Sequence, residues 1–278
     1  KICEDKDLTY KFLKNANVPV PIGKSFDRNT NFEDIVKYTK SLDFPLVVKP
    51  KDGKAGRGVA VNIQDEITLK NAILRVNELG YDSFIVQQHV QGKEIRVYVL
   101  DNKVVAAANR IPANVIGDGH STIAKLIEMK NEFRKQIPHL YYRPIKIDAE
   151  VRELIAKAGY TLESVLKKGE RLYLRKVSNV STGGDPVDFT EKLTEKQQSI
   201  AIAATKAIPG LTHCGVDMII DDKGNGVILE INTRPGIGTH LFPVEGKARD
   251  VPKAIIDFYF PETIGERNLS SRIYYDLQ

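Results

Sequence analysis

Two carboxylates and an amide oxygen are placed to share one face of a predicted β-hairpin in residues 215–232. Two apolar runs, 216–220 and 227–232, flank the turn-forming cluster 221–226, and this pattern is typical of a hairpin. Because side chains alternate along a strand, Asn232 falls on the same face as Glu230. A turn centred between Lys223 and Gly224 predicts the opposed pairs Val216 with Ile231, Met218 with Leu229, Ile220 with Val227 and Asp217 with Glu230.

Asp217 and Glu230 need something between them, since carboxylates directly opposite on antiparallel strands repel. Carboxylate and amide oxygens are the hard ligands that Mg²⁺ accepts while it keeps water and phosphate oxygens in its other positions. The alternative is an edge hairpin with an acidic solvent face, but Ile219 and Ile228 share that face. The pattern therefore predicts a magnesium site made by Asp217, Glu230 and Asn232.

A glycine-rich segment lies between two short β-type runs, 45–50 and 59–63. Gly53, Gly56 and Gly58 carry no Cβ, so the backbone amides around them can approach phosphate oxygens closely. The segment is not a Walker A loop, because GxxxxGK[ST] is absent and the segment leads to a strand rather than a helix. A flexible turn with no ligand is the alternative interpretation.

Helix and strand patterns follow one another along the rest of the chain. Apolar spacing predicts helices over 4–16, 31–42 and 65–80, and β-type runs predict strands over 84–90, 94–100 and 104–109. Along 94–100, Glu94, Arg96 and Tyr98 alternate with Ile95, Val97 and Val99, which predicts one polar and one core face. Further helices are expected over 121–131, capped by Ser121, and over 148–158 and 161–165.

Composition sets outer limits on function. With 42% hydrophobic and 28% charged residues the chain is typical of a globular enzyme, and no apolar run approaches the ~18 residues of a membrane span. A net charge of +5 without a long Lys/Arg block suits a small anionic ligand and does not indicate nucleic acid. Cys3 and Cys214 stand in no metal or redox spacing and no signal peptide begins the chain, so we expect a reducing cytoplasm.

The order of these elements and motifs resembles the ATP-grasp superfamily from about residue 2 to residue 262. Within it, the chain is similar to the ligase domains of cyanophycin synthetases and of bifunctional glutathione synthetases. The motifs that carry the resemblance are Asp5-Lys6, VVKP at 47–50 with its glycine loop, IVQQHVQGKE at 85–94, RIPANVIGDG at 110–119, LRKVSNVSTGG at 174–184, and the hairpin followed by TRPG at 233–236.

The resemblance implies an α+β ATP-grasp fold of two α+β subdomains with ATP bound between them. An N-terminal helix over 1–18 is expected to lead into a small subdomain over 19–92, which contains the glycine loop. A large subdomain over 93–262 would follow, with a helical insertion at about 111–173, and then a C-terminal tail over 263–278. The insertion is rich in basic residues and is either a lid or docking surface for an acidic peptide, or a solvated helical segment.

The resemblance also assigns the nucleotide and metal ligands. Gln87 would meet the adenine amino group, with the backbone of Gln88 and Val90 completing that contact, and Glu94 would bind the ribose hydroxyls. One or two Mg²⁺ ions, with Mn²⁺ as a substitute, would be held by Asp217, Glu230 and Asn232. The residues implied at the ATP phosphates are Lys6, Lys49, Gly53, Gly56 and Gly58.

Other residues are assigned to the reacting groups. Arg110, Arg175 and Asn179 would face the γ-phosphate and a substrate carboxylate, although each arginine has an alternative as an ordinary surface residue. Gly183 and Gly184 would let the chain pass close to the reacting centre. The residues expected to hold the substrate after the metal hairpin are Arg234, Gly236, His240 and Arg249; His240 is equally well interpreted as a structural histidine.

The implied activity is that of a carboxylate–amine ligase, which forms an amide through an acyl phosphate on an amino acid or peptide. The alternatives are an ATP-dependent kinase and a nucleotide-binding regulatory module without turnover. No nucleic acid or membrane partner is expected, and a homo-oligomer would be unsurprising. Relatives begin with a further domain that is missing here, and the first residue is Lys, so the chain is expected to be a piece of a longer protein.

Overall fold

The computed structural model describes residues 2–53 and 56–265, and these form two compact units. Unit 1 comprises Lys1–Lys93 and Thr194–Arg234, and unit 2 comprises Glu94–Leu193 and Pro235–Gln278. The change of unit after Lys93 falls beside the predicted subdomain boundary. Residues 194–234, by contrast, group with the N-terminal unit rather than with the predicted large subdomain. Most of the predicted C-terminal tail, residues 266–278, lies outside the described residues.

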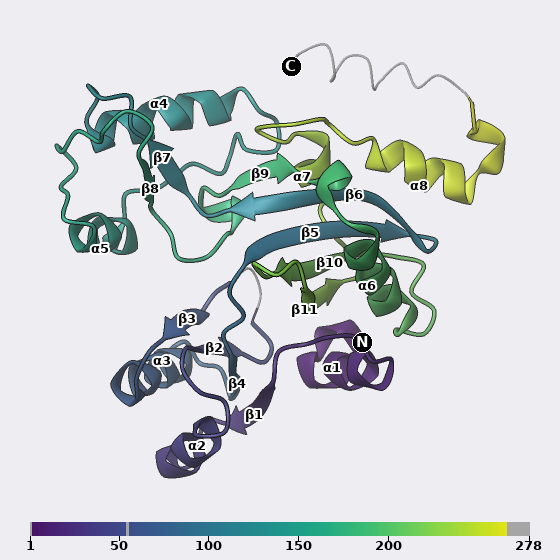
Figure 1. Cartoon of the computed structure of the whole chain (residues 1–278), viewed down its shortest axis with the longest axis horizontal. Coiled ribbons are helices and arrows are strands. Elements are labelled where there is room, and N and C mark those ends of the chain that lie inside the picture. Colours follow the sequence, from purple (N-terminus) through teal and green to yellow (C-terminus); the bar gives the residue numbers. More distant parts are fainter. Residues whose placement is uncertain (1, 54–55, 266–278) are drawn as a thin grey trace. The chain divides into compact units, whose positions relative to one another are not determined.

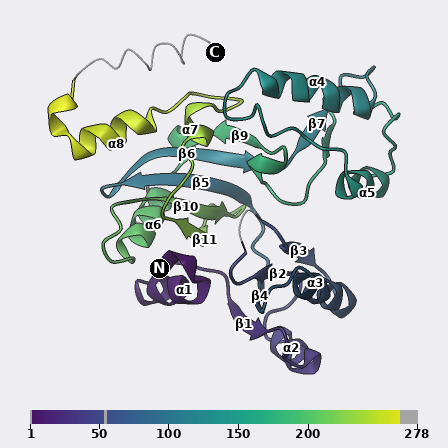
Figure 2. The ribbon, with the colours of Figure 1, turned by 180° about the vertical axis from the view of Figure 1, so that it is seen from behind.

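Unit 1 contains a four-stranded antiparallel sheet with two helices on one face (Figures 1 and 2). The strand order is β1 (Gly23–Asp27), β4 (Ser83–Gln88), β2 (Leu46–Pro50), β3 (Ala60–Ile63). Helices α2 (Phe32–Thr39) and α3 (Glu66–Glu78) pack their apolar residues against the same side of these strands. An Asp65–Thr68 capping box starts α3, as expected for a helix that begins near Asp65.

Strand alternation decides which residues of this sheet face away from the helices. Leu46 and Val48 of β2 and Phe84 and Val86 of β4 belong to the helix-covered core. Side chains on a strand alternate between faces, so Lys49 and Gln87 project from the opposite face. Both are nevertheless buried.

The predicted hairpin is confirmed as β10 (His213–Ile220) and β11 (Gly226–Asn232), which lie in unit 1 with α6 (Glu195–Lys206), η1 (Ile2–Glu4) and α1 (Lys6–Asn15). Asp217 is opposite Glu230 and Val216 opposite Ile231, as predicted. The predicted pairs of Met218 with Leu229 and Ile220 with Val227 are wrong, because Met218 pairs with Ile228 and Ile220 with Gly226. The cause is a register shift after Asp217 that leaves Leu229 as an extra residue, a β-bulge.

Unit 2 has an antiparallel core of three strands, β5 (Lys93–Leu100), β6 (Lys103–Ile111) and β9 (Asp185–Asp188). Asp101 and Asn102 turn β5 into β6 with positive φ angles of 44° and 62°. The predicted polar face of β5 is interrupted, since Tyr98 is buried. The elements after β9 are η3 (Thr190–Lys192), α7 (Gly238–Leu241), α8 (Val251–Tyr259) and η4 (Pro261–Thr263).

The expected helical insertion is a small layer with its own apolar core, in which α4 (Ile123–Lys135) and α5 (Ala149–Lys157) pack with the ribbon β7 (Asn114–Ile116) and β8 (Arg171–Tyr173). The expected Ser121 cap is wrong, because the Thr122 side chain caps α4 by accepting from the Lys125 amide. The third expected helix, over 161–165, is also wrong. There Thr161 and Ser164 form a turn, and the carbonyls of Leu162 and Ser164 accept the first amides of α4.

Over the described ranges, none of the helices combines the length and the apolar character that crossing a bilayer requires.

Replacing Leu69 by Ala tests the packing of α3 on the sheet of unit 1. Leu69 is 0% exposed, and we expect a cavity that lowers the free energy of unfolding by about 2–5 kcal/mol in chemical denaturation. Ile67 on the same helix is 75% exposed, so Ile67→Ala is the matched control with an expected change within about 0.5 kcal/mol. Equal losses in the two variants would contradict the assignment of the core face.

Candidate functional site

Two lysines of unit 1 are withdrawn from solvent, Lys49 as a buried residue and Lys6 as a partly buried one. Lys49, 9% exposed, donates a hydrogen bond from Nζ to the Tyr10 hydroxyl at 3.0 Å. Lys6 donates from Nζ to the carbonyls of Lys51 at 2.9 Å and Gly53 at 3.2 Å. Burial lowers the pKa of Lys49 to about 8, and Glu230 partly offsets this effect. Burial likewise lowers the pKa of Lys6, again against the attraction of Glu230. Partly desolvated cations of this kind attract anions, and the predicted contact of these two lysines with phosphate stays a prediction.

The glycine loop begins where Lys6 donates its bond to Gly53, and residues 54–55 lie outside the described ranges. Gly56 and Gly58 have φ angles of 74° and 75°, in the left-handed region that favours glycine. A Cβ at Gly58 would stand 2.9 Å from Cγ of Pro50, at the end of β2. The backbone path of the loop therefore requires glycine at this position. Its predicted contact with phosphate remains a prediction.

Gln87 offers a buried acceptor in unit 1. It is 3% exposed, and its Oε1 atom has no hydrogen-bond partner among the described residues. It projects from the same face of the sheet as Lys49, and beyond it the Gln88 amide donates to the Ile22 carbonyl at 2.8 Å. Val90, predicted to offer a backbone contact, follows the end of β4 and is partly buried. A buried acceptor left unsatisfied costs about 1–3 kcal/mol, so an N–H donor from a ligand fits Gln87.

The predicted metal ligands are brought together by the hairpin. Asp217 is buried and lies opposite Glu230, and Nδ2 of Asn232 donates to Oδ2 of Asp217 at 3.3 Å. Glu230 also acts electrostatically on Lys6 and Lys49. In the described part of the chain no three His, Cys, Asp or Glu residues gather as metal ligands. Carboxylate and amide oxygens are ligands of the kind that Mg²⁺ accepts beside water, and the predicted metal site remains a prediction.

In unit 2, the predicted ribose ligand Glu94 and the predicted catalytic Arg110 lie together. Arg110 donates to one carboxylate oxygen of Glu94, and the Ser178 hydroxyl donates to the other. Arg110 and Glu94 come from the neighbouring strands β6 and β5, whereas Ser178 lies before the loop that leads to β9. Both carboxylate oxygens of Glu94 thus have partners within the unit. Ser178 was not singled out from the sequence, because a lone serine carries no recognisable spacing.

Arg175 points to the start of α5. Its guanidinium donates to both carboxylate oxygens of Asp148, at 2.8 and 2.6 Å, to Glu150 at 2.9 Å and to the Lys146 carbonyl at 3.3 Å. The alternative of an exposed surface arginine is wrong, since Arg175 is buried. Its predicted contact with a γ-phosphate or carboxylate stays a prediction, and the observed contacts tie the segment after β8 to α5.

The loop over 179–185 contains Asn179, Gly183 and Gly184, which were all assigned to the reacting centre. The Asn179 carbonyl accepts from the amides of Thr182 at 3.1 Å and Gly184 at 2.9 Å, around the short helix η2 (Val180–Thr182). Gly183 has φ 102°, and a Cβ there would stand 2.6 Å from Cγ1 of Ile145. The packing of the loop itself therefore demands glycine at 183, whatever passes beside it.

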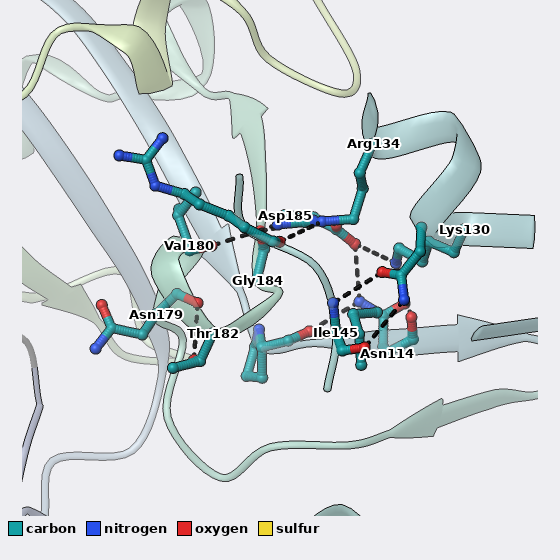
Figure 3. Close-up of polar contacts among 12 residues, drawn as sticks. Asn114, Lys130, Arg134, Ile145, Asn179, Val180, Thr182, Gly184 and Asp185 are labelled. Atoms are coloured by element: carbon teal, nitrogen blue, oxygen red, sulfur yellow. Dashed lines mark hydrogen bonds and ion pairs between the residues drawn. The ribbon is translucent and has the colours of Figure 1, made fainter. Parts of the chain in front are cut away.

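A buried polar cluster lies against this loop (Figure 3). The sequence motifs did not predict that its residues lie together. Asp185 accepts from Lys130, from Nδ2 of Asn114 at 3.0 Å and from Arg134 at 3.0 Å. Lys130 and Arg134 come from one face of α4, at a spacing of four residues. The predicted helix ended at 131, three residues before Arg134, so the shared face of the two cations was not apparent.

The four predicted substrate residues are divided between the two units, and in unit 2 the Arg249 amide donates to the His240 carbonyl at 2.8 Å. Arg234 is exposed in unit 1, whereas Gly236, His240 and Arg249 belong to unit 2. Arg249 donates to both carboxylate oxygens of Asp188, at 3.2 and 2.6 Å, and to Glu191 at 3.2 Å. Their contacts with a substrate remain predictions.

His240 is 2% exposed, and neither ring nitrogen has a hydrogen-bond partner among the described residues. Its ring meets the Tyr98 ring edge-on at 6.1 Å between centroids. Burial, with Arg96 nearby, lowers the pKa of His240 to about 3. The imidazole is therefore neutral at physiological pH.

Residues 3–238 match the ATP-grasp domain family. The chain belongs to this family. It is 37% identical over 265 residues to a cyanophycin synthetase of Trichormus variabilis, covering 92% of this chain and 29% of the relative. It is 35% identical over 273 residues to the glutathione biosynthesis bifunctional protein GshAB of Clostridium perfringens, covering 93% and 34%.

A solved structure agrees with this ATP-grasp assignment. The bifunctional glutathione synthetase of Pasteurella multocida superposes with a TM-score of 0.68 at 30% identity, over 94% of this chain and 36% of that one. The ATP-grasp chain thus spans about a third of the length of these relatives.

The low pKa of His240 predicts a pH-dependent stability. Between the ordinary value near 6.5 and about 3 the unfolded chain binds the proton and the folded chain does not, so stability falls as pH falls through this window. Between pH 7 and pH 5, protonation of His240 in the unfolded chain should lower the free energy of unfolding by about 2 kcal/mol. We expect His240→Phe to lose less stability than the parent over this interval in denaturant titrations, whereas contributions from neighbours such as His139 largely cancel in the comparison. Equal pH responses would contradict a buried neutral His240.

Proposed function

We propose that this chain is the ATP-binding and bond-forming part of an ADP-forming carboxylate–amine ligase. The observation that carries the proposal is the arrangement in unit 1, where the opposed carboxylates Asp217 and Glu230 accompany the buried Lys49 and the partly buried Lys6. A cation pair beside a carboxylate pair suits a metal–polyphosphate ligand, in which each charge finds an opposite one. The names of the relatives, a cyanophycin synthetase and two glutathione-forming proteins, support amide formation as the reaction.

The residues of unit 1 suit ATP as the nucleotide. Lys6 and Lys49 would bind phosphate oxygens, and the backbone between Gly53 and Gly58 would lie against them. The unsatisfied Oε1 of Gln87 would accept from the exocyclic amino group of adenine. Asp217, Glu230 and Asn232 would hold Mg²⁺, which supplies neutralisation of phosphate charge when bound.

The reaction would proceed in two steps. An oxygen of the substrate carboxylate attacks the γ-phosphorus of ATP, and the bond from that phosphorus to the bridging oxygen breaks. ADP is released, and the substrate now carries an acyl phosphate. The amine nitrogen then attacks the acyl carbon, inorganic phosphate leaves with the bonding electrons, and the nitrogen loses a proton. Such chemistry depends on positioning and charge rather than on a protein nucleophile, which agrees with a site of lysines, arginines and glycines.

In this proposal Arg110 and Asn179 contact the reacting groups, and the carboxylate substrate is an amino acid or a peptide. Arg110 is already oriented by Glu94, so its guanidinium occupies a defined place in unit 2. The relatives' names point to two substrate classes, the precursors of cyanophycin and of glutathione.

Phosphate release tests the proposal. The chain would be incubated with ATP and Mg²⁺ and, in separate reactions, with amino acids, with γ-glutamylcysteine and glycine, and with short aspartyl peptides. The products would be identified by mass spectrometry. A new amide together with equimolar ADP and phosphate is the expected result. ADP with a stable phosphorylated product would indicate a kinase, and ATP binding without turnover in any mixture would indicate a regulatory module.

Asp217→Asn and Glu230→Gln test the metal assignment with little change in shape. Each removes one negative charge from the proposed cation site, and we expect Mg²⁺-dependent turnover to fall about 10²- to 10³-fold. Asp222→Asn, in the exposed turn of the same hairpin, removes the same charge and should leave turnover unchanged. Parental rates in Glu230→Gln would contradict the site.

Gln87→Leu tests the nucleotide assignment. The variant lacks the acceptor proposed for adenine, and one hydrogen bond of about 0.5–1.5 kcal/mol corresponds to an ATP Kd raised roughly two- to thirteenfold. The control is Gln88→Leu, because Gln88 is assigned a backbone contact and its side chain is exposed. Calorimetric Kd values that are the same for Gln87→Leu and the parent would remove Gln87 from the nucleotide site.

A further inference from the structure

The guanidinium of Arg134 spans the loop over 179–185. Arg134 is 1% exposed, and it donates to the carbonyls of Val180 at 3.3 Å and Gly184 at 3.1 Å and to Oδ1 of Asp185 at 3.0 Å. Its Nε donates to the Arg143 carbonyl at 2.9 Å. One planar group thus binds both ends of a loop that turns back on itself.

Lys130, one helical turn earlier in α4, completes the attachment. Its amino group donates to Oδ2 of Asp185 and to the Asn114 carbonyl at 2.7 Å. Burial lowers the pKa of Lys130, and the neighbouring Asp185 opposes this change. The buried Arg134 and the partly buried Lys130 therefore hold a single carboxylate, and between them they bind the loop and the ribbon that begins at Asn114.

Packing of α4 does not by itself require these two cations. The helix is already anchored by Ile123, Leu126 and Ile127, which lie in the apolar core of the insertion. All acceptors of Arg134 and Lys130 named above belong instead to the loop and to neighbouring backbone segments. What the two cations add to an already packed helix is a defined path for residues 180–185.

We propose that Arg134 and Lys130 are positioning residues for amide formation: by binding Asp185 and the carbonyls of Val180 and Gly184, they hold the loop that presents Asn179. Figure 3 shows Asn179 projecting from the side of the loop away from Lys130 and Arg134. The two cations act through the loop and touch no reacting atom. This inference rests on the proposed function, in which Asn179 contacts the reacting groups.

The test uses Lys130→Met, Arg134→Lys and Arg134→Met in the 278-residue chain, with Lys125→Met and Lys135→Met as controls. The control lysines also lie on α4, but each is exposed and pairs with a glutamate three residues away. Arg134→Lys keeps the charge and one or two of the four hydrogen bonds, so it remains informative if Arg134→Met does not fold.

The first readout is independent of activity. Amide hydrogen exchange of peptides covering 177–187 should be at least about tenfold faster in Lys130→Met and Arg134→Met, with Arg134→Lys in between and both controls at the parental rate. Parental exchange over 177–187 in the folded Lys130→Met and Arg134→Lys variants would overturn the inference.

The second readout is kinetic. We expect kcat for amide formation to fall about 10²-fold in Lys130→Met while the ATP Kd, set by unit 1, stays within twofold of the parent. Faster loop exchange together with parental kcat would also overturn the inference, because the loop would then be held without consequence for the reaction. A parent chain that forms no amide with any substrate would contradict the proposed function, and the exchange experiment would still decide whether the cations hold the loop.

Discussion

The buried amino group of Lys49 is the constraint around which unit 1 is built. Its strand places it on the face of the sheet away from α2 and α3, and an unpaired ammonium in such a place costs several kcal/mol. Its partner is the Tyr10 hydroxyl, which itself donates to the Leu229 carbonyl at 2.9 Å. Leu229 is the extra residue of the bulge in β11, so the bulge supplies the acceptor that completes the chain of bonds. Strand β2, helix α1 and the carboxylate hairpin are thereby connected through one buried charge.

Unit 2 contains a buried charge of the opposite sign, a carboxylate that is bound by cations. The Asp185 carboxylate is buried at the start of β9, and two cations of α4 and an amide of β7 bind it. Removing one partner of such a group leaves the others buried and uncompensated, which typically costs about 3–5 kcal/mol. The same contacts determine the path of the loop before β9, so stability and the geometry of the proposed reacting centre depend on the same bonds.

Local patterns were sufficient to predict much of this arrangement. The alternation of apolar residues and the turn formers at 221–226 identified the hairpin and placed Asp217 opposite Glu230, because strand periodicity and turn chemistry are local properties. The bulge at Leu229 was missed, since the alternation of apolar residues does not mark it and its carbonyl bonds to Tyr10, which is distant in sequence. The helix predicted at 161–165 failed for a similar reason, because the carbonyls there bind the start of α4 rather than one another.

Side-chain partners were the least predictable feature. Glu94 and Arg110 were both recognised from motifs, but that each is the other's partner follows from the pairing of β5 with β6. Arg134 was not recognised at all, because its acceptors lie between 9 and 51 residues away along the chain. The glycine at 183 was assigned to the reacting centre, and the structure adds that Ile145 leaves no room there for a Cβ.

The central claim is that the buried Lys49 and the partly buried Lys6 bind the phosphates of ATP, and proton uptake on binding tests it most directly. A pKa of about 8 leaves Lys49 about half protonated at pH 8, and contact with a phosphate would raise that pKa. Calorimetric titration of ATP with Mg²⁺ at pH 8, in buffers of different ionisation enthalpy, should show an uptake of up to about half a proton per ATP that is lost in Lys49→Met. Binding heats that do not depend on the buffer, or uptake that persists in Lys49→Met, would contradict the account.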